Sequence, residues 1–252
     1  MKRLIHLNVF IYARGHHEAA WRHPKAPVWS LMDIRHDVAC ARKAGAACFD
    51  SFFLADVLNL PPDADASARI WLEPLTTLSA IAMATSRIGL IGTASTTHTE
   101  PFNLARQFAS LDHISSGRAA WNVVTSFSAA GSRNFDSSGR LAHADRYARG
   151  DEFVEIVKKL WDSWSDDAVV DDRAAGTFYV KERVRSIDHD GTYYHIAGPL
   201  NLPRSPQGRP VLVQAGSSEA GKDFAAKHAE AVFTAHMHQS TAQDFYGDLK
   251  RR

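Results

Sequence analysis

The order of hydrophobic and polar positions alternates between short strand-like runs and longer segments with helical spacing. The strand-like runs are residues 48–58, 86–97, 117–126, 209–216 and 230–237. The segments with helical spacing or a helix-starting signal are residues 30–47, 73–85, 100–115, 143–164, 217–229 and 240–252. This regular alternation predicts βαβ units and therefore a parallel sheet.

The first 15 residues have a basic start followed by a short apolar stretch, which resembles a signal peptide. His6 and Asn8 interrupt that stretch, so that apolar and polar residues alternate as they do in a strand. We therefore expect a first β-strand here rather than an export signal. No apolar segment approaches the roughly 20 residues that a membrane-spanning helix needs.

The pattern contains six strand–helix units, whereas a closed (β/α)8 barrel needs eight. A chain of 252 residues has a typical barrel length, but its long loops use the residues that the last two units would need. We therefore expect an α/β fold of the TIM-like barrel type, truncated after about six βα units. Residues 1–252 would form this single, C-terminally incomplete domain, with residues 166–210 as an insertion.

Composition and charge favour a small-molecule partner over nucleic acid or a membrane. Lys and Arg number 29 against 28 Asp and Glu, and the formal net charge of +1 offers no general attraction to a polyanion. Cys40 and Cys48 make neither a disulfide framework nor a metal-ligand set, and they suit a reducing cytoplasm. The sequence also lacks the G-x-G-x-x-G and Walker nucleotide-binding motifs.

The densest group of potential metal ligands is HHEAAWRH, residues 16–23. Its spacing is not that of the H-E-x-x-H zinc motif, because Trp21 stands where the second histidine of the motif would be. We therefore expect no metal. The loop that begins with His16 and His17 either lines a pocket or is a solvated surface loop, and the sequence leaves both interpretations open.

Polar residues follow two predicted strands at their carboxyl ends, the edge where parallel α/β folds bind ligands. Asp56 ends the run FFLAD, and Thr93 and Ser95 lie in GTAST. Hydroxyl groups at this edge can bond the carbonyl or ring nitrogen of a ligand, although threonine is also a common strand residue. Alternatively, the Asp56 carboxylate caps backbone N–H groups of its own loop.

The segment QAGSSEAG, residues 214–221, joins a predicted strand to a predicted helix. Ser217 and Ser218 fall at the helix N-cap, where free N–H groups and the helix dipole favour a phosphate. An ordinary serine N-cap would have the same spacing. His143 and Tyr147 are four residues apart near the start of another predicted helix, so their side chains lie on the same helix face. Two interpretations are open: both side chains contact the phosphate, or they only pack within the fold.

The strand-like run at residues 117–126 carries polar groups whose burial is costly unless they have partners. Asn122 lies in its middle, and Thr125 and Ser126 end it. Since side chains alternate across a strand, Asn122 shares a face with Val124 and Ser126. If that face is internal, a bound ligand is the expected partner of these polar groups.

Five ordered motifs together resemble one family across essentially the whole chain. They are GHHEAAWRHP, FDSFFLAD, STTHTEPFNLARQFASLDHISSGRAAWNVVTS, DEFVEIVKKLWDSW and QAGSSEAG. They resemble the luciferase-like flavin monooxygenases, within the group of nitrilotriacetate monooxygenase, dibenzothiophene sulfone monooxygenase and the pristinamycin synthase large subunit. One position departs from the pattern: Ser116 replaces an expected glycine, and Gly117 alone is expected to accommodate the turn at the helix end.

The resemblance implies a TIM-like barrel with an insertion that binds reduced FMN. Dioxygen would add to the flavin at C4a, and the resulting C4a-peroxyflavin would oxygenate a small organic substrate while the protein excludes water and orients the reactants. The isoalloxazine side would contact Asp56 and Thr93. The ribityl phosphate would be held by His143, Tyr147, Ser217 and Ser218. No residue is singled out as catalytic.

The implied partners are an NAD(P)H-dependent flavin reductase that supplies reduced FMN, the substrate, dioxygen, and further copies of the chain in a homo-oligomer. Two alternatives to a cytoplasmic FMN-dependent monooxygenase remain. One is a truncated, inactive flavin-binding remnant. The other is a flavin-independent hydrolase or isomerase that uses the His-rich loop and Asp56 on the same barrel.

Overall fold

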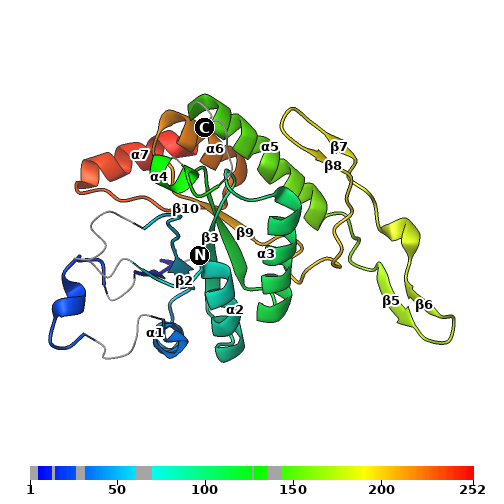
Figure 1. Ribbon diagram of the computed structural model, residues 1–252, viewed down its shortest axis with the longest axis horizontal. Helices are drawn as coiled ribbons and strands as arrows, with labels where there is room; N and C mark the ends of the chain where they lie inside the picture. The colour runs from blue at the N-terminus through cyan, green and yellow to red at the C-terminus, as the bar shows by residue number, and fades with distance from the viewer. Residues whose placement is uncertain (1–4, 13–14, 27–31, 61–69, 127, 136–142) are drawn as a thin grey trace.

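A six-stranded parallel sheet forms the centre of the computed structural model, which describes residues 5–12, 15–26, 32–60, 70–126, 128–135 and 143–252 (Figure 1). The strand order is β1-β2-β3-β4-β9-β10, and every neighbouring pair is parallel. The strands are β1 (Asn8–Ile11), β2 (Ser51–Leu54), β3 (Gly89–Ser95), β4 (Ala119–Val124), β9 (Val211–Gln214) and β10 (Ala231–Val232). The predicted parallel α/β sheet and the predicted first strand near the N-terminus are confirmed, and this strand lies at one edge of the sheet.

Helices follow the strands along the chain, as the alternating pattern predicts. The longer ones are α1 (Ile34–Ala46), α2 (Pro74–Ala84), α3 (Pro101–Ser115), α5 (His143–Trp161), α6 (Glu219–His228) and α7 (Gln239–Arg251). Three short ones are η1 (Ala20–Arg22), α4 (Ala129–Ser132) and η2 (Lys181–Arg183). The start of α2 shows why such helices begin where they do: Pro74 occupies its first turn, and the Glu73 carboxylate accepts hydrogen bonds from the free N–H groups of Leu75 and Thr76, each at 2.8 Å.

The outer face of β4 forms the centre of the hydrophobic core between the sheet and its helices. Trp121 is fully buried, and its ring centroid lies 5.8 Å from that of Phe108 in α3 and 5.9 Å from that of Phe153 in α5. Because side chains alternate along a strand, the next residue, Asn122, points to the opposite, inner face of the sheet.

The sheet is curled, so that its first and last strands approach each other across the inner face. Phe233 directly follows β10, and its ring centroid lies 5.8 Å from both Phe10 in β1 and Phe53 in β2. These contacts join side chains from opposite ends of the strand order. The inner face is therefore the concave side of a half-barrel, as a TIM-like architecture requires.

Two small hairpins lie between α5 and β9, outside the six-stranded sheet. They pair β5 (Val169–Asp172) with β6 (Thr177–Tyr179) and β7 (His189–Asp190) with β8 (His195–Ile196), and they extend to the right in Figure 1. The Glu152 carboxylate of α5 holds the second hairpin by accepting from the backbone N–H groups of Tyr193 and Tyr194. That residues 166–210 are an insertion within a single domain stays a prediction.

The turn between α3 and β4 differs in one detail from the expectation that Gly117 alone accommodates it. Ser116 also adopts the left-handed conformation, with φ of 57°, and Gly117 follows with φ of 83°. The N–H of Gly117 donates to the carbonyl of Asp112, which closes the helix end. A serine therefore occupies a conformation for which glycine is the usual residue.

Asp112, near the end of α3, joins three parts of the fold through one buried carboxylate. It is fully buried and accepts from the N–H of Ala119 in β4 at 3.2 Å. It also accepts from the backbone N–H of Gln207 at 3.0 Å and from its side-chain Nε2 at 2.6 Å. The loop that leads into β9 is thereby fixed against the start of β4.

We expect Asp112→Ala to lower the free energy of unfolding by about 3 kcal/mol, because it leaves the buried N–H of Ala119 without an acceptor and breaks both bonds from Gln207 to the carboxylate. Denaturant unfolding followed by circular dichroism measures the loss. Asp244→Ala, at an exposed position of α7, is the control and should change stability by less than about 0.5 kcal/mol. Equal effects of the two substitutions would contradict the role of Asp112.

Candidate functional site

Two adjoining cavities lie at the carboxyl edge of the sheet. The first, here called the β2–β4 cavity, measures about 240 Å³, and its lining is mainly apolar in surface but includes the polar residues Asp56, Asn59, Thr93, Ser95, His98, Thr125, Ser126 and Ser128. The second, the β9–α6 cavity, measures about 560 Å³ and is lined by Arg146, Tyr147, Gln214 and residues 215–218, among others. Val124 and Thr125, at the end of β4, line both cavities, so the two adjoin across a shared wall.

Beneath the β2–β4 cavity, a chain of hydrogen bonds crosses three strands on the inner face. The Thr93 hydroxyl donates to the carbonyl of Leu54 at 2.9 Å, and the Asn122 Nδ2 donates to Thr93 Oγ1 at 2.9 Å. Since Thr93 uses its single proton on Leu54, it can only accept from a ligand. The Asn122 Oδ1 atom is buried and has no partner among the described residues. The inner face thus holds one unused acceptor at its centre.

Asp56 follows β2 and lines the same cavity. Burial raises the pKa of its carboxyl, and the nearby Glu73 raises it further, while the N–H of Val57 and the side chain of Trp71 lower it by hydrogen bonding. The structure therefore combines both interpretations of Asp56: its carboxylate accepts a bond in its own loop, and it also faces the cavity.

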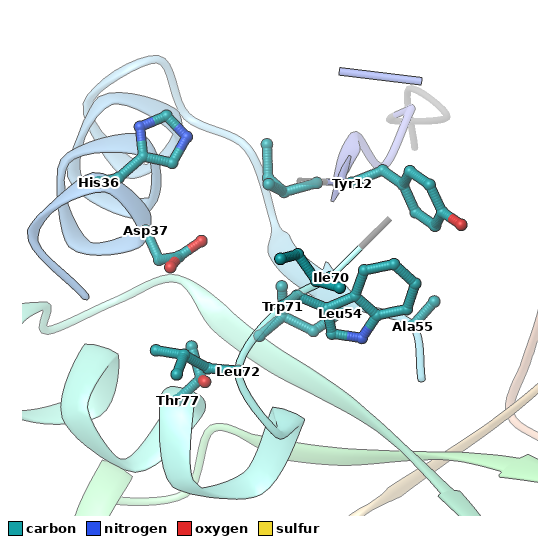
Figure 2. Close-up of a pocket in the computed structure, with 10 residues that line it drawn as sticks. Tyr12, His36, Asp37, Leu54, Ala55, Ile70, Trp71, Leu72 and Thr77 are labelled. Carbon is teal, nitrogen blue, oxygen red and sulfur yellow. The ribbon is translucent and has the colours of Figure 1, made fainter. Parts of the chain in front are cut away.

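Figure 2 shows a smaller cavity that is lined by Trp71 and by residues of β2, α1 and α2. The Asp37 carboxylate points toward it, and burial raises the pKa of this group. The cavity measures about 30 Å³, against about 240 Å³ for the β2–β4 cavity.

The β9–α6 cavity opens at the N-terminus of α6. Ser218 is the N-cap, and its Oγ accepts from the N–H of Gly221 at 3.1 Å. A methyl group on Gly221 would lie 3.0 Å from the Tyr147 hydroxyl and 3.1 Å from Gly216, so close packing at this turn favours glycine. Ser217 precedes the cap and is exposed.

Tyr147 reaches this turn from α5. Its hydroxyl lies 3.5 Å from Ser218 Oγ, and its ring packs edge-on against Phe224 of α6. Three of the four residues expected at a phosphate, Tyr147, Ser217 and Ser218, therefore lie together. The fourth, His143, begins α5, and its side chain lies outside the described part of the structure.

Two lining residues escaped the sequence reasoning. Arg146 lines the β9–α6 cavity beside Tyr147, and a basic residue next to a suspected phosphate ligand was the available signal. His98 lines the β2–β4 cavity three residues after Ser95, and the same strand edge could have pointed to it. The packing that turns His98 inward was not readable from local sequence.

Two histidines of the His-rich loop make hydrogen-bond contacts with backbone groups, one in β1 and one within the loop. His16 Nε2 lies 3.3 Å from the carbonyl of Phe10, and His17 Nδ1 accepts from the N–H of Ala19 at 3.1 Å.

No group of three or more His, Cys, Asp or Glu side chains among the described residues could hold a metal ion. None of the helices in the described ranges is long and apolar enough to cross a membrane.

Comparison with known proteins now decides the family. Residues 7–251 match the family described as luciferase-like monooxygenase. This chain belongs to that family. The N-acetyl-S-(2-succino)cysteine monooxygenase of Bacillus subtilis (strain 168) is 49% identical over 251 residues, which are 100% of this chain and 57% of the relative. Nitrilotriacetate monooxygenase component A of Aminobacter aminovorans is 44% identical and is matched by 98% of this chain over 57% of its own length. The resemblance stated from the motifs is thus confirmed.

Solved structures agree with this luciferase-like fold. A long-chain alkane monooxygenase, LadA, superposes with a TM-score of 0.95 at 36% identity, over 100% of this chain and 61% of LadA. A riboflavin lyase, RcaE, crystallised with modified FMN and riboflavin, gives a TM-score of 0.92 at 32% identity, over 99% of this chain and 58% of RcaE. The TIM-like fold class is confirmed, and the chain spans about three fifths of the length of these relatives.

We expect Asp56→Asn to stabilise the ligand-free protein at pH 7. The folded-state pKa of Asp56 lies above its ordinary 3.8, so the ionised carboxylate destabilises the fold above that raised pKa. This advantage of Asn should shrink as the pH falls through the raised pKa toward 3.8, which unfolding curves at pH 7 and pH 4 would detect.

Asp50→Asn is the matched control, because the pKa of Asp50 is shifted in the opposite direction to that of Asp56. Hydrogen bonds from the N–H of Leu7 and from His6 lower the pKa of Asp50. This substitution should therefore destabilise the protein at pH 7, with an effect that fades in acid. A pH-independent effect of Asp56→Asn would contradict the assigned role of burial.

Proposed function

We propose that this chain binds FMN across its two adjoining cavities and is the oxygenase part of a two-component monooxygenase. The observation that carries the proposal is the shared wall at Val124 and Thr125. On one side of this wall lies the β9–α6 cavity with the N-terminus of α6, and on the other lies the β2–β4 cavity with the polar groups of the strand ends. One elongated ligand would reach both cavities.

The β9–α6 cavity fits a phosphate. Free N–H groups and the positive end of the α6 dipole favour an anion, and Arg146 adds a full positive charge at the wall. Ser218 accepts from Gly221 and retains its own proton for a phosphate oxygen, while the exposed Ser217 hydroxyl is a further donor. These donors would hold the ribityl phosphate, with Tyr147 beside them and His143 one turn earlier.

The β2–β4 cavity fits the ring system. Asp56 and Thr93 lie at its wall, and the unpartnered Asn122 Oδ1 lies beneath it. An isoalloxazine ring offers both donors and acceptors, and a buried acceptor such as Asn122 Oδ1 gains most from a ligand N–H. At the polar end of the strand, Ser126 has a partner within the protein, because its hydroxyl donates to Ser95 Oγ at 2.7 Å, so among the buried polar atoms described on this strand only Asn122 Oδ1 is left for the proposed ligand to complete.

The relatives support the same cofactor and reaction. RcaE, a riboflavin lyase, was crystallised with modified FMN, and the relatives named from Bacillus subtilis and Aminobacter aminovorans are monooxygenases. Bound reduced FMN would supply the electrons that activate dioxygen, so that one oxygen atom is transferred to a small organic substrate. The chain's own residues would bind the flavin, orient it and exclude water from its ring.

Three further expectations belong to the proposal. A separate NAD(P)H-dependent flavin reductase would supply the reduced FMN, and the chain would act as a homo-oligomer. A reducing cytoplasm is the proposed location, supported by Cys40 and Cys48, which are both free thiols.

We expect Arg146→Met to weaken FMN binding about 10- to 100-fold, the size of a lost hydrogen bond to a charged group. Riboflavin, which lacks the phosphate, should bind both proteins equally. Flavin fluorescence titration measures both affinities. The control is Arg173→Met, whose side chain is 90% exposed on the β5–β6 hairpin and should leave both affinities unchanged. Loss of riboflavin affinity in Arg146→Met would contradict a phosphate role.

The reaction itself is tested by supplying reduced FMN through a flavin reductase under isotope-labelled dioxygen. A panel of thioethers, sulfones and aminopolycarboxylates serves as candidate substrates. We expect one labelled oxygen atom in the product of at least one class, and only when both FMN and the reductase are present. Product formation without flavin would favour the hydrolase or isomerase alternative instead.

A further inference from the structure

His98 lies in the loop after β3 and is held rigidly at the wall of the β2–β4 cavity. The N–H of Thr97 donates to Ser95 Oγ at 3.1 Å, and the Thr99 hydroxyl donates to the carbonyl of Ser95. Arg149 of α5 donates to the carbonyl of Thr97 at 3.0 Å. The residues on both sides of His98 are therefore fixed by bonds to the strand and to a helix.

The His98 ring also has a fixed orientation. It stacks on Phe135, with ring centroids 4.4 Å apart and planes inclined by 11°. Such a stack restricts rotation of the imidazole and leaves its edge, which carries both nitrogens, directed away from the phenyl face.

Both ring nitrogens, Nδ1 and Nε2, are buried and have no hydrogen-bond partner among the residues that the structure describes. Burial lowers the pKa of His98, and the positive charge of Arg149 lowers it further. A neutral imidazole has one donor and one acceptor, and burying both without partners is costly. Among the described residues, the His98 ring thus has a packing partner in Phe135, whereas its two nitrogens have no hydrogen-bond partner.

We propose that His98 is a binding residue for the flavin ring, and that one of its nitrogens forms a hydrogen bond to the polar edge of the isoalloxazine. This inference rests on the proposed function and extends it to a residue that no motif singled out. The geometry that carries it is a rigid, stacked imidazole with unused nitrogens at the wall of the cavity that also contains Asp56 and Thr93.

The ring edge fits His98 better than the phosphate does. The phosphate-binding groups, namely Arg146, Tyr147 and the N-terminus of α6, line the other cavity. A neutral imidazole gives a doubly charged phosphate little electrostatic attraction, whereas it matches the uncharged carbonyl and N–H groups of a flavin pyrimidine ring.

His98→Phe separates the two roles that the side chain could have. The phenyl ring keeps the stack on Phe135 but carries no nitrogens. We expect the ligand-free variant to melt at a higher temperature than the wild type, because two unpartnered buried polar atoms are removed. We expect riboflavin and FMN affinities to fall by the same factor, about tenfold, as for one lost hydrogen bond.

Conservative variants identify the nitrogen involved. An amide nitrogen or oxygen of Asn lies near the position of Nδ1, and that of Gln lies near Nε2. We expect either His98→Asn or His98→Gln to recover part of the riboflavin affinity that His98→Phe loses. His98→Leu repeats the apolar test should the phenyl variant fail to fold. His195→Phe, at a hairpin side chain that is 72% exposed, is the control for a histidine-to-phenylalanine change.

The outcomes separate this inference from the function on which it rests. If wild-type protein binds riboflavin and Arg146→Met weakens only FMN, but His98→Phe or His98→Leu leaves both affinities unchanged, the role of His98 is overturned and the proposed function stands. A larger loss for FMN than for riboflavin also overturns it, because His98 would then act on the phosphate. If the wild type binds neither flavin, the proposed function fails and takes the role of His98 with it.

Discussion

Parallel pairing of the strands is the constraint on which the rest of the structure depends. Because all six strands run in the same direction, their carboxyl ends meet at one edge, and residues from distant parts of the sequence become neighbours there. Asp56 and Ser218 lie 162 positions apart, yet each lines one of two hollows that share a wall. The curl of the sheet, marked by the contacts of Phe233 with Phe10 and Phe53, turns this edge into the rim of a concave surface.

Much of this arrangement could be predicted, because the signals are local. Apolar periodicity located the strands and helices, and the Glu-Pro start of α2 and the serine cap of α6 appear in the structure as expected. The stack of His98 on Phe135 could not be predicted, because it depends on elements brought together only by folding, whereas Arg146 could have been singled out as the basic neighbour of Tyr147. The left-handed Ser116 was missed for a different reason: residue preference favours glycine there, and the helix end imposes the conformation regardless.

On the inner face of the sheet, the polar groups that suit a ligand lower the stability of the ligand-free protein. The outer face is filled by Trp121 and other large apolar side chains, whereas the inner face buries the amide of Asn122 and the ionisable carboxyl of Asp56. Polar groups at such positions lower the stability of the ligand-free fold unless a ligand completes their hydrogen bonds. The fully bonded carboxylate of Asp112, at the opposite end of β4, shows how the same fold treats a buried charge whose role is structural.

The wall formed by Val124 and Thr125 fixes the spacing between the β2–β4 cavity and the β9–α6 cavity. Both residues lie at the end of β4 or directly follow it, and β4 pairs with β3 on one side and with β9 on the other. Because paired strands lie about 4.8 Å apart, the sheet fixes the spacing between β3, which carries Thr93, and β9, which leads to α6. In the proposed FMN site, a ligand with a longer or shorter link between its ring and its charged end would satisfy only one cavity, so the end of β4 would select a cofactor by its length as well as by its functional groups.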